Sequence, residues 1–208
     1  DKIRALEAQL FEDLRRAAAA ETTRLQAHAR RLAALDVASA LAEAANRHGW
    51  SSPTLVDETV LCISEGRHPV VERLLPAQRF IPNSTEMDGS DRRLLLLTGP
   101  NMAGKSTYMR QVALIVVMAQ MGSYVPTEDA TIGLVDQIFT RVGAHDDIAG
   151  GRSTFMVEMS ETASILARAT SRSLILLDEI GRGTSTFDGI SIAWAVAEDV
   201  HHRIGART

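Results

Sequence analysis

The chain has 208 residues, of which 45% are hydrophobic and 23% charged, a composition typical of a soluble globular protein. Its apolar runs are far shorter than a membrane span, and its first residues do not have the pattern of a signal peptide. The net charge of −4 provides no general attraction to nucleic acid, so a DNA-related function needs another argument.

The single cysteine, Cys62, cannot form an internal disulfide. We expect it to be a small buried residue within a strand, in a protein of the reducing cytoplasm.

Residues 1–48 contain neither Gly nor Pro and predict a helical segment. Two apolar stripes predict a pair of amphipathic helices that pack on another surface, with a break near residues 17–23. The stripes consist of Ile3, Leu6, Leu10 and Leu14, followed by Leu25, Ala29, Leu32 and Leu35. Basic and acidic residues nearly balance here, which argues against a DNA-gripping surface.

The region after Gly49 predicts a strand over 59–63 and a polar loop over 76–91. His68 precedes a proline and is assigned a structural rather than a catalytic role. Phe80 is a large aromatic residue within the polar loop. Packing onto the core and stacking on an adenine ring explain it equally well at this point.

Residues 99–107 read GPNMAGKST, the G-x-x-x-x-G-K-S pattern of a phosphate-binding loop. The apolar run Leu94–Leu97 predicts a buried strand before the loop, and residues 108–121 predict a buried helix after it. In such a loop, Lys105 reaches the β- and γ-phosphates and the Ser106 hydroxyl binds Mg²⁺.

A strand over 137–142 and a Gly-rich loop over 143–152 are expected next. Ser153 or Thr154 then has the position of a helix N-cap, with Val157 or Glu158 three or four residues further on. The helix after it is expected from a pattern through Met156, Met159, Ile165 and Leu166.

Leu174–Leu177 followed by Asp178 and Glu179 predicts a buried strand whose carboxyl end opens into a ligand crevice. Asp178 is expected to hold Mg²⁺ through its water shell, and Glu179 is the candidate general base for an attacking water. Together with the phosphate loop, this pattern indicates a nucleoside triphosphatase. A further helix is expected over 187–200.

Three segments in this order resemble the MutS family of DNA mismatch-repair ATPases: residues 99–111, 153–159 and 177–186. The resemblance covers residues 58–208. It implies an α/β, P-loop NTPase fold of the ABC type, with a mainly parallel sheet flanked by helices, over residues 49–208. Residues 1–48 are similar to the end of the lever and core helices of that family.

The resemblance implies a composite site, in which one subunit's phosphate loop and the other's signature segment enclose ATP. It makes Glu179 and Lys105 catalytic, Ser106 and Asp178 the metal site, and Ser153 with Thr154 the contact to the neighbour's nucleotide. It favours Phe80 as the residue that stacks on adenine. The implied nucleotide-binding residues are Phe80, Ile81, Asn83, Gly99, Pro100, Asn101, Met102, Ala103, Gly104, Lys105, Ser106 and Thr107.

The implied cofactors are ATP or ADP and Mg²⁺. The implied partners are a second copy of the chain, mismatched double-stranded DNA bound mostly through regions outside these residues, and a MutL-type protein. The implied location is the bacterial cytoplasm, at the nucleoid, with no membrane contact.

Departures from the family leave two alternatives. The strand that leads to the family's switch histidine is not reached, and neither His201 nor His202 replaces that residue. The chain could therefore be a nucleotide-binding module without turnover. An SMC-type ATPase is the other alternative, suggested by the N-terminal helices, although sustained heptads are missing.

Overall fold

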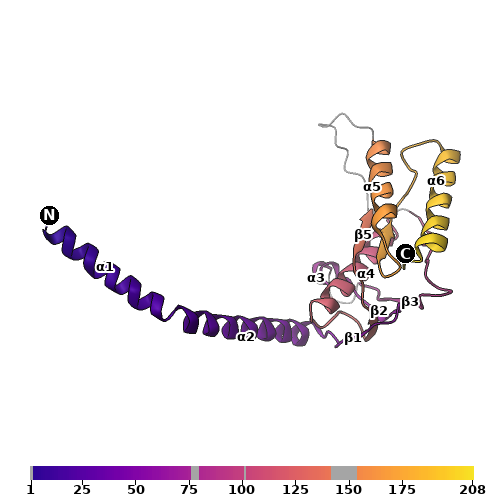
Figure 1. Ribbon diagram of the computed structural model, residues 1–208. Helices are drawn as coiled ribbons and strands as arrows, with labels where there is room; N and C mark the ends of the chain where they lie inside the picture. Colours follow the sequence, from indigo (N-terminus) through magenta and orange to yellow (C-terminus); the bar gives the residue numbers. More distant parts are fainter. Residues whose placement is uncertain (1, 76–79, 101, 142–153) are drawn as a thin grey trace. The chain divides into compact units, whose positions relative to one another are not determined.

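The computed structural model describes residues 2–75, 80–100, 102–141 and 154–208 (Figure 1). The chain divides into two units, residues 1–47 and residues 48–208. No helix among the described residues has both the length and the apolar character that a membrane crossing requires.

The first unit is helical. Helix α1 (Lys2–Ala20) and helix α2 (Thr22–His48) are separated at Glu21, which lies in the predicted break. The leucine stripes are more than half exposed, with Leu14 at 71% and Leu35 at 67%. That these stripes pack on another surface therefore stays a prediction.

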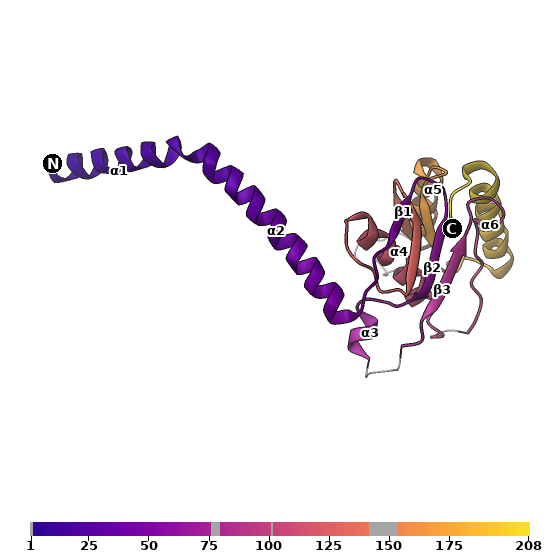
Figure 2. The same ribbon diagram turned by 90° about the horizontal axis from the view of Figure 1, so that it is seen from below.

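The second unit contains a four-stranded sheet in the order β1-β4-β2-β3 (Figure 2). Its strands are β1 (Thr54–Val56), β2 (Leu61–Gly66), β3 (Asn83–Met87) and β4 (Asp129–Gly133). Strand β1 is parallel to β4, whereas β2 is antiparallel to both β3 and β4. The expected mainly parallel sheet is therefore not found here, because the described residues between β1, β2 and β3 form the short helix α3 (Val71–Leu74) and no full crossover helix.

Cys62 lies within β2, as expected, but it is exposed rather than buried. Side chains alternate along a strand, and its neighbours Leu61 and Ile63 are the ones that enter the core. The prediction of a buried cysteine was wrong.

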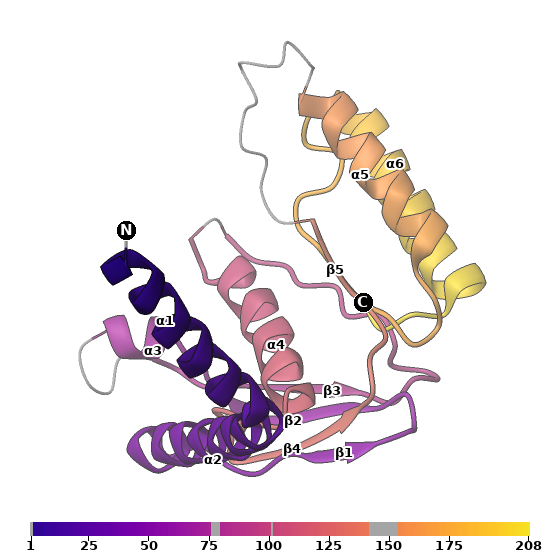
Figure 3. The ribbon, with the colours of Figure 1, turned by 60° about the vertical axis from the view of Figure 1, so that its left-hand side comes forward.

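A second, two-stranded sheet is parallel and consists of β5 (Ile138–Arg141) and β6 (Leu174–Leu177). Helix α5 (Thr154–Arg168) connects them and lies beside α6 (Thr186–Asp199), which continues into a π-helical turn, η2 (Val200–Ile204) (Figure 3). Strand β6 is buried on both faces. Leu174 and Leu176 pack in the core around helix α4 (Lys105–Gln120), and Ile175 packs with α5 and α6.

The predicted strand Leu94–Leu97 does not form. Residues 206–208 lie between this run and β6, because Ile175 donates to the Arg207 carbonyl and Leu95 donates to the Thr208 carbonyl. Thr208 is the last residue of the sequence. Leu96 is 83% exposed and has no ladder partner in the described part of the chain.

Arg207 joins the two sheets and is only 1% exposed. Its guanidinium donates to four carbonyl oxygens at 2.9–3.3 Å, those of Val60 before β2, Gly133 and Leu134 at the end of β4, and Arg172 before β6. Burial lowers its pKa, yet the group stays charged because an arginine pKa is far above neutrality.

Replacing Arg207 by Met removes these donors, and the carbonyl of the buried Gly133 loses its bond to the guanidinium. We expect Arg207→Met to lower the free energy of unfolding by about 2–4 kcal/mol, measured by urea denaturation. Arg207→Lys keeps the positive charge but has fewer hydrogen-bond donors, so it should lose less stability than Arg207→Met. Equal stability of the Met variant and the parent would contradict this role.

His68 is 7% exposed and has a structural position, as expected. Its Nδ1 accepts the backbone N–H groups of Val70 and Val71 at 3.2 Å, at the start of α3. These bonds require a neutral imidazole. Burial lowers the pKa of His68, and the charge of Arg110 lowers it further.

Stability should therefore fall with acidification. The unfolded state takes up the His68 proton first, as the pH drops through about 6.5, and the folded state binds it only at lower pH. We expect the urea midpoint of the parent to fall between about pH 7.5 and about pH 5.5, and that of His68→Asn, which does not titrate, to fall less. An identical pH dependence in both proteins would exclude His68 as the source.

Candidate active site

The phosphate-loop motif ends at the N-terminus of α4. Gly104 precedes the helix with φ of +91°, a left-handed conformation that glycine adopts without steric cost. The loop therefore leads directly into α4, whose first free N–H groups and positive dipole end attract an anion. Asn101, a predicted γ-phosphate contact, lies outside the described residues.

Lys105 lies across the loop. Its Nζ donates to the carbonyl oxygens of Gly99 at 2.8 Å and Pro100 at 2.9 Å. An ammonium group has three donors, so one N–H remains for a phosphate oxygen. The lysine is thus held in position by the same loop that is predicted to bind phosphate.

Ser106 and Asp178 bring the two predicted motifs together. The Ser106 hydroxyl donates to Asp178 Oδ2 at 2.5 Å, although the residues are 72 positions apart in sequence. Asp178 follows β6, and its backbone N–H donates to the Arg141 carbonyl at the end of β5 at 2.7 Å. The parallel pairing of β5 and β6 therefore positions the carboxylate beside α4.

Glu179 has an unusual backbone conformation. Its φ is +52°, in the left-handed region that non-glycine residues seldom adopt. Its carboxylate forms an ion pair with Arg182, and its side chain is 38% exposed. The glutamate thus lies in a strained turn at the mouth of the site, with a cation beside it.

The predicted adenine segment lies on and before β3. Phe80 is half-buried, Ile81 is 79% exposed, and Asn83 Nδ2 donates to the Ile81 carbonyl at 2.9 Å. Tyr108 of α4 bonds the Thr85 hydroxyl at 2.7 Å and connects β3 to the phosphate-loop helix. Sequence reasoning did not single out Tyr108, because one tyrosine in an apolar helix gives no signal.

The predicted signature contact Ser153 lies outside the described residues, and only the helical backbone is described for Thr154. The N-cap that Val157 or Glu158 was expected to complete lies outside the described residues. The Glu158 carboxylate accepts the Gly181 N–H at 2.5 Å, in the loop after Glu179. The sequence spacing alone could not show this contact, because it joins residues 23 positions apart.

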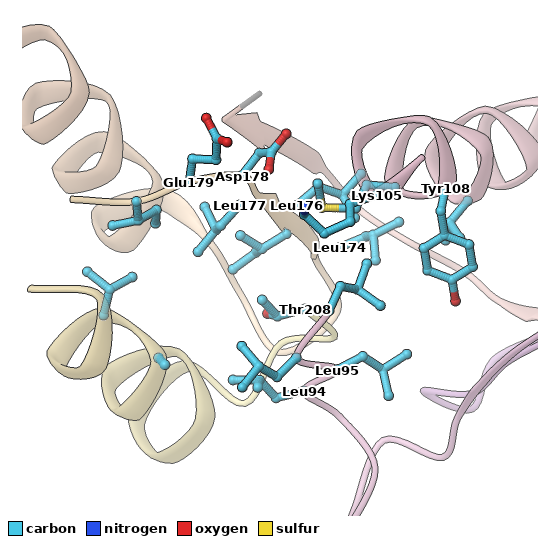
Figure 4. A pocket seen from close by; sticks show the side chains of 18 of the residues that line it. Leu94, Leu95, Lys105, Tyr108, Leu174, Leu176, Leu177, Asp178, Glu179 and Thr208 are labelled. Carbon is cyan, nitrogen blue, oxygen red and sulfur yellow. The ribbon is translucent and has the colours of Figure 1, made fainter. Parts of the chain in front are cut away.

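Behind the loop is a cavity of about 340 Å³ (Figure 4). Leu94–Leu97 and Leu174–Leu177 line it together with residues of α4 and α6, and Lys105, Asp178 and Glu179 also contribute to its wall. The two carboxylates lie at the end of the cavity opposite Leu94 and Leu95. Because the wall is largely apolar, a triphosphate fits better over the N-terminus of α4 than inside this cavity.

The comparisons with known proteins agree on one family. Residues 95–208, more than half of the chain, match the family model described as MutS domain V. The chain is 58% identical over 208 residues to the DNA mismatch repair protein MutS of Acetivibrio thermocellus, covering 100% of this chain and 24% of that protein. It is 61% identical over 206 residues to the protein of the same name from Sorangium cellulosum, covering 98% of this chain and 22% of that protein.

The chain thus spans about a quarter of the length of these curated relatives. The family match excludes the SMC-type alternative. With the phosphate loop at the start of α4 and the Asp178 carboxylate beside it, the chain belongs to the MutS family, and residues 95–208 are its domain V, the ATPase domain.

Proposed function

We propose that this chain binds ATP and hydrolyses it to ADP and phosphate, as the ATPase part of a longer mismatch-repair protein. The observation that carries the proposal is the contact of Ser106 with Asp178, 2.5 Å long, beside a loop-held Lys105. In this assignment residues 49–208 form an ABC-type ATPase domain, and residues 1–48 form the end of the lever and core helices.

The residues at this contact fit Mg²⁺. The ion prefers hard oxygen ligands and is usually bound by one or two protein groups, with waters and phosphates completing its shell. The described residues hold no cluster of three or more His, Cys, Asp or Glu side chains, as a site built from protein ligands alone would need. Ser106 and Asp178 would hold the ion, which would neutralise charge on the β- and γ-phosphates.

Lys105 and Glu179 are the proposed catalytic residues. The free N–H of Lys105 would bind the β- and γ-oxygens and stabilise their charge during transfer. Glu179 would accept a proton from the attacking water or orient that water in line with the leaving group. The nucleotide site would include residues 99–107, together with Phe80 stacked on adenine and with Ile81 and Asn83 beside it.

A second copy of the chain would complete the site, with its Ser153 and Thr154 approaching the γ-phosphate. Binding and hydrolysis in this dimer would change the state of a clamp on mismatched double-stranded DNA. The DNA and a MutL-type partner would bind mostly through regions outside these residues. The proposed location is the bacterial cytoplasm, at the nucleoid.

One observation favours a nucleotide-binding role without turnover. The Glu179 carboxylate is paired with Arg182, so in this conformation it contacts a cation instead of being free to bind an attacking water. In that alternative, the chain would bind nucleotide and would dimerise weakly, without releasing phosphate.

Phosphate release with Mg·ATP, measured over a series of protein concentrations, tests the proposal. We expect activity to rise faster than linearly with protein, because the site needs two copies. Glu179→Gln should lower kcat by about 100-fold or more and leave ATP binding nearly unchanged. ATP binding without phosphate release at any concentration would instead establish the binding role.

Magnesium dependence tests the metal assignment. Ser106→Ala removes one oxygen ligand, so we expect the Mg²⁺ concentration for half-maximal activity to rise about 10-fold or more. Ser191→Ala is the matched control, because its hydroxyl donates to the Phe187 carbonyl on α6, away from the loop. An unchanged Mg²⁺ requirement in Ser106→Ala would exclude Ser106 as a ligand.

A further inference from the structure

Glu158 is a buried carboxylate that the proposed mechanism does not use. It lies in the second turn of α5 and is 5% exposed. Burying a carboxylate is costly unless hydrogen bonds compensate, so the partner that it has among the described residues is informative. That partner is the Gly181 N–H, two residues after Glu179.

The loop that carries Glu179 is held between two helices. Gly181 has φ of +82°, and an added Cβ would lie 2.5 Å from the Gly189 carbonyl oxygen of α6. On the other side, a Cβ at Gly183 would lie 3.1 Å from the Cα of Phe155 on α5. The backbone of the loop thus contacts both helices directly, and Glu158 adds its hydrogen bond from the α5 side.

Glu179 needs such support. A left-handed conformation at a non-glycine residue persists only where surrounding structure enforces it. The Glu179 carbonyl accepts the Arg182 N–H at 3.4 Å, which makes residues 179–182 one turn. The Gly181 amide lies inside that turn, so the bond from Glu158 holds the turn at its centre.

We propose that Glu158 is a positioning residue that holds the Glu179 turn in its productive conformation through the Gly181 amide. This inference rests on the proposed ATPase function. Two properties of the side chain at position 158 should then decide the activity: its length and its ability to accept a hydrogen bond. Its negative charge should have little effect. The side-chain oxygen of Gln accepts the same bond, and the side chain of Asp is shorter by one C–C bond of about 1.5 Å.

The test compares Glu158→Gln, Glu158→Asp and Glu158→Ala in the full-length protein. We expect the Ala and Asp variants to lose about 10- to 100-fold in kcat, because small misplacements of a catalytic group have effects of this size. ATP binding, measured at equilibrium, should stay within about twofold, since the phosphate loop is untouched. The Gln variant should keep kcat within about threefold of the parent.

Thr162→Val is the matched control. Thr162 lies one turn further along α5 and is 3% exposed, so its near-isosteric replacement perturbs the same buried face of the helix while the bond from Glu158 to Gly181 stays in place. It should leave kcat unchanged. A similar loss of kcat in Thr162→Val would show that Glu158 acts only through the stability of α5.

Retention of full kcat by Glu158→Asp would overturn the proposal, and so would a loss of kcat in Glu158→Gln as large as that in Glu158→Ala. Hydrogen exchange separates this failure from failure of the ATPase assignment. A peptide covering residues 178–184 should exchange faster in Glu158→Asp than in Glu158→Gln, whether or not the parent hydrolyses ATP. Absence of phosphate release by the parent would contradict the proposed function, and equal exchange in the two variants would contradict the proposed role of Glu158.

Discussion

The hydrogen bond between Ser106 and Asp178 is the contact on which the candidate site depends. It brings the first turn of α4 to the end of β6, and thereby joins a loop that suits phosphate to a carboxylate that suits Mg²⁺. Neither residue alone defines a nucleotide site, because serines start many helices and aspartates follow many strands. Their approach makes the arrangement specific, since a hydroxyl and a carboxylate that converge beside a helix N-terminus provide oxygen ligands where a triphosphate would bind.

The approach is possible because β6 is buried on both faces. Leu174 and Leu176 pack against the α4 core, while Ile175 packs with α5 and α6. The strand therefore cannot rotate without exposing the apolar side chains of one of its two faces. Its pairing with β5 determines where it ends, since the Asp178 N–H donates to Arg141. The apolar residues of β6 thus determine where Asp178 lies.

Sequence patterns predicted the elements around the site well, because those elements follow local rules. Helix α4, helix α5 and strand β6 were expected from apolar periodicity and length, and the structure confirms them. The expected strand at Leu94–Leu97 was wrong, because a strand needs a ladder of partners and, among the described residues, this run has only the bond from Leu95 to the Thr208 carbonyl. The contact of Glu158 with the Gly181 amide could not be predicted either. Its sequence position near the start of a helix suggests a cap, whereas its partner depends on the packing of the loop against α5 and α6.

Two kinds of support therefore hold the proposed metal ligand Asp178 and the proposed base Glu179, and they differ in rigidity. Asp178 follows a strand that two cores enclose, so its position changes only if those cores are disrupted. Glu179, one residue later, has left the strand and depends on a strained turn with glycine contacts and one buried carboxylate. Its side chain can pair with Arg182 in the same turn. Adjacent residues thus have unequal freedom: the proposed metal ligand is fixed by the core, and the proposed base is held by contacts that a modest shift of α5 or α6 would alter.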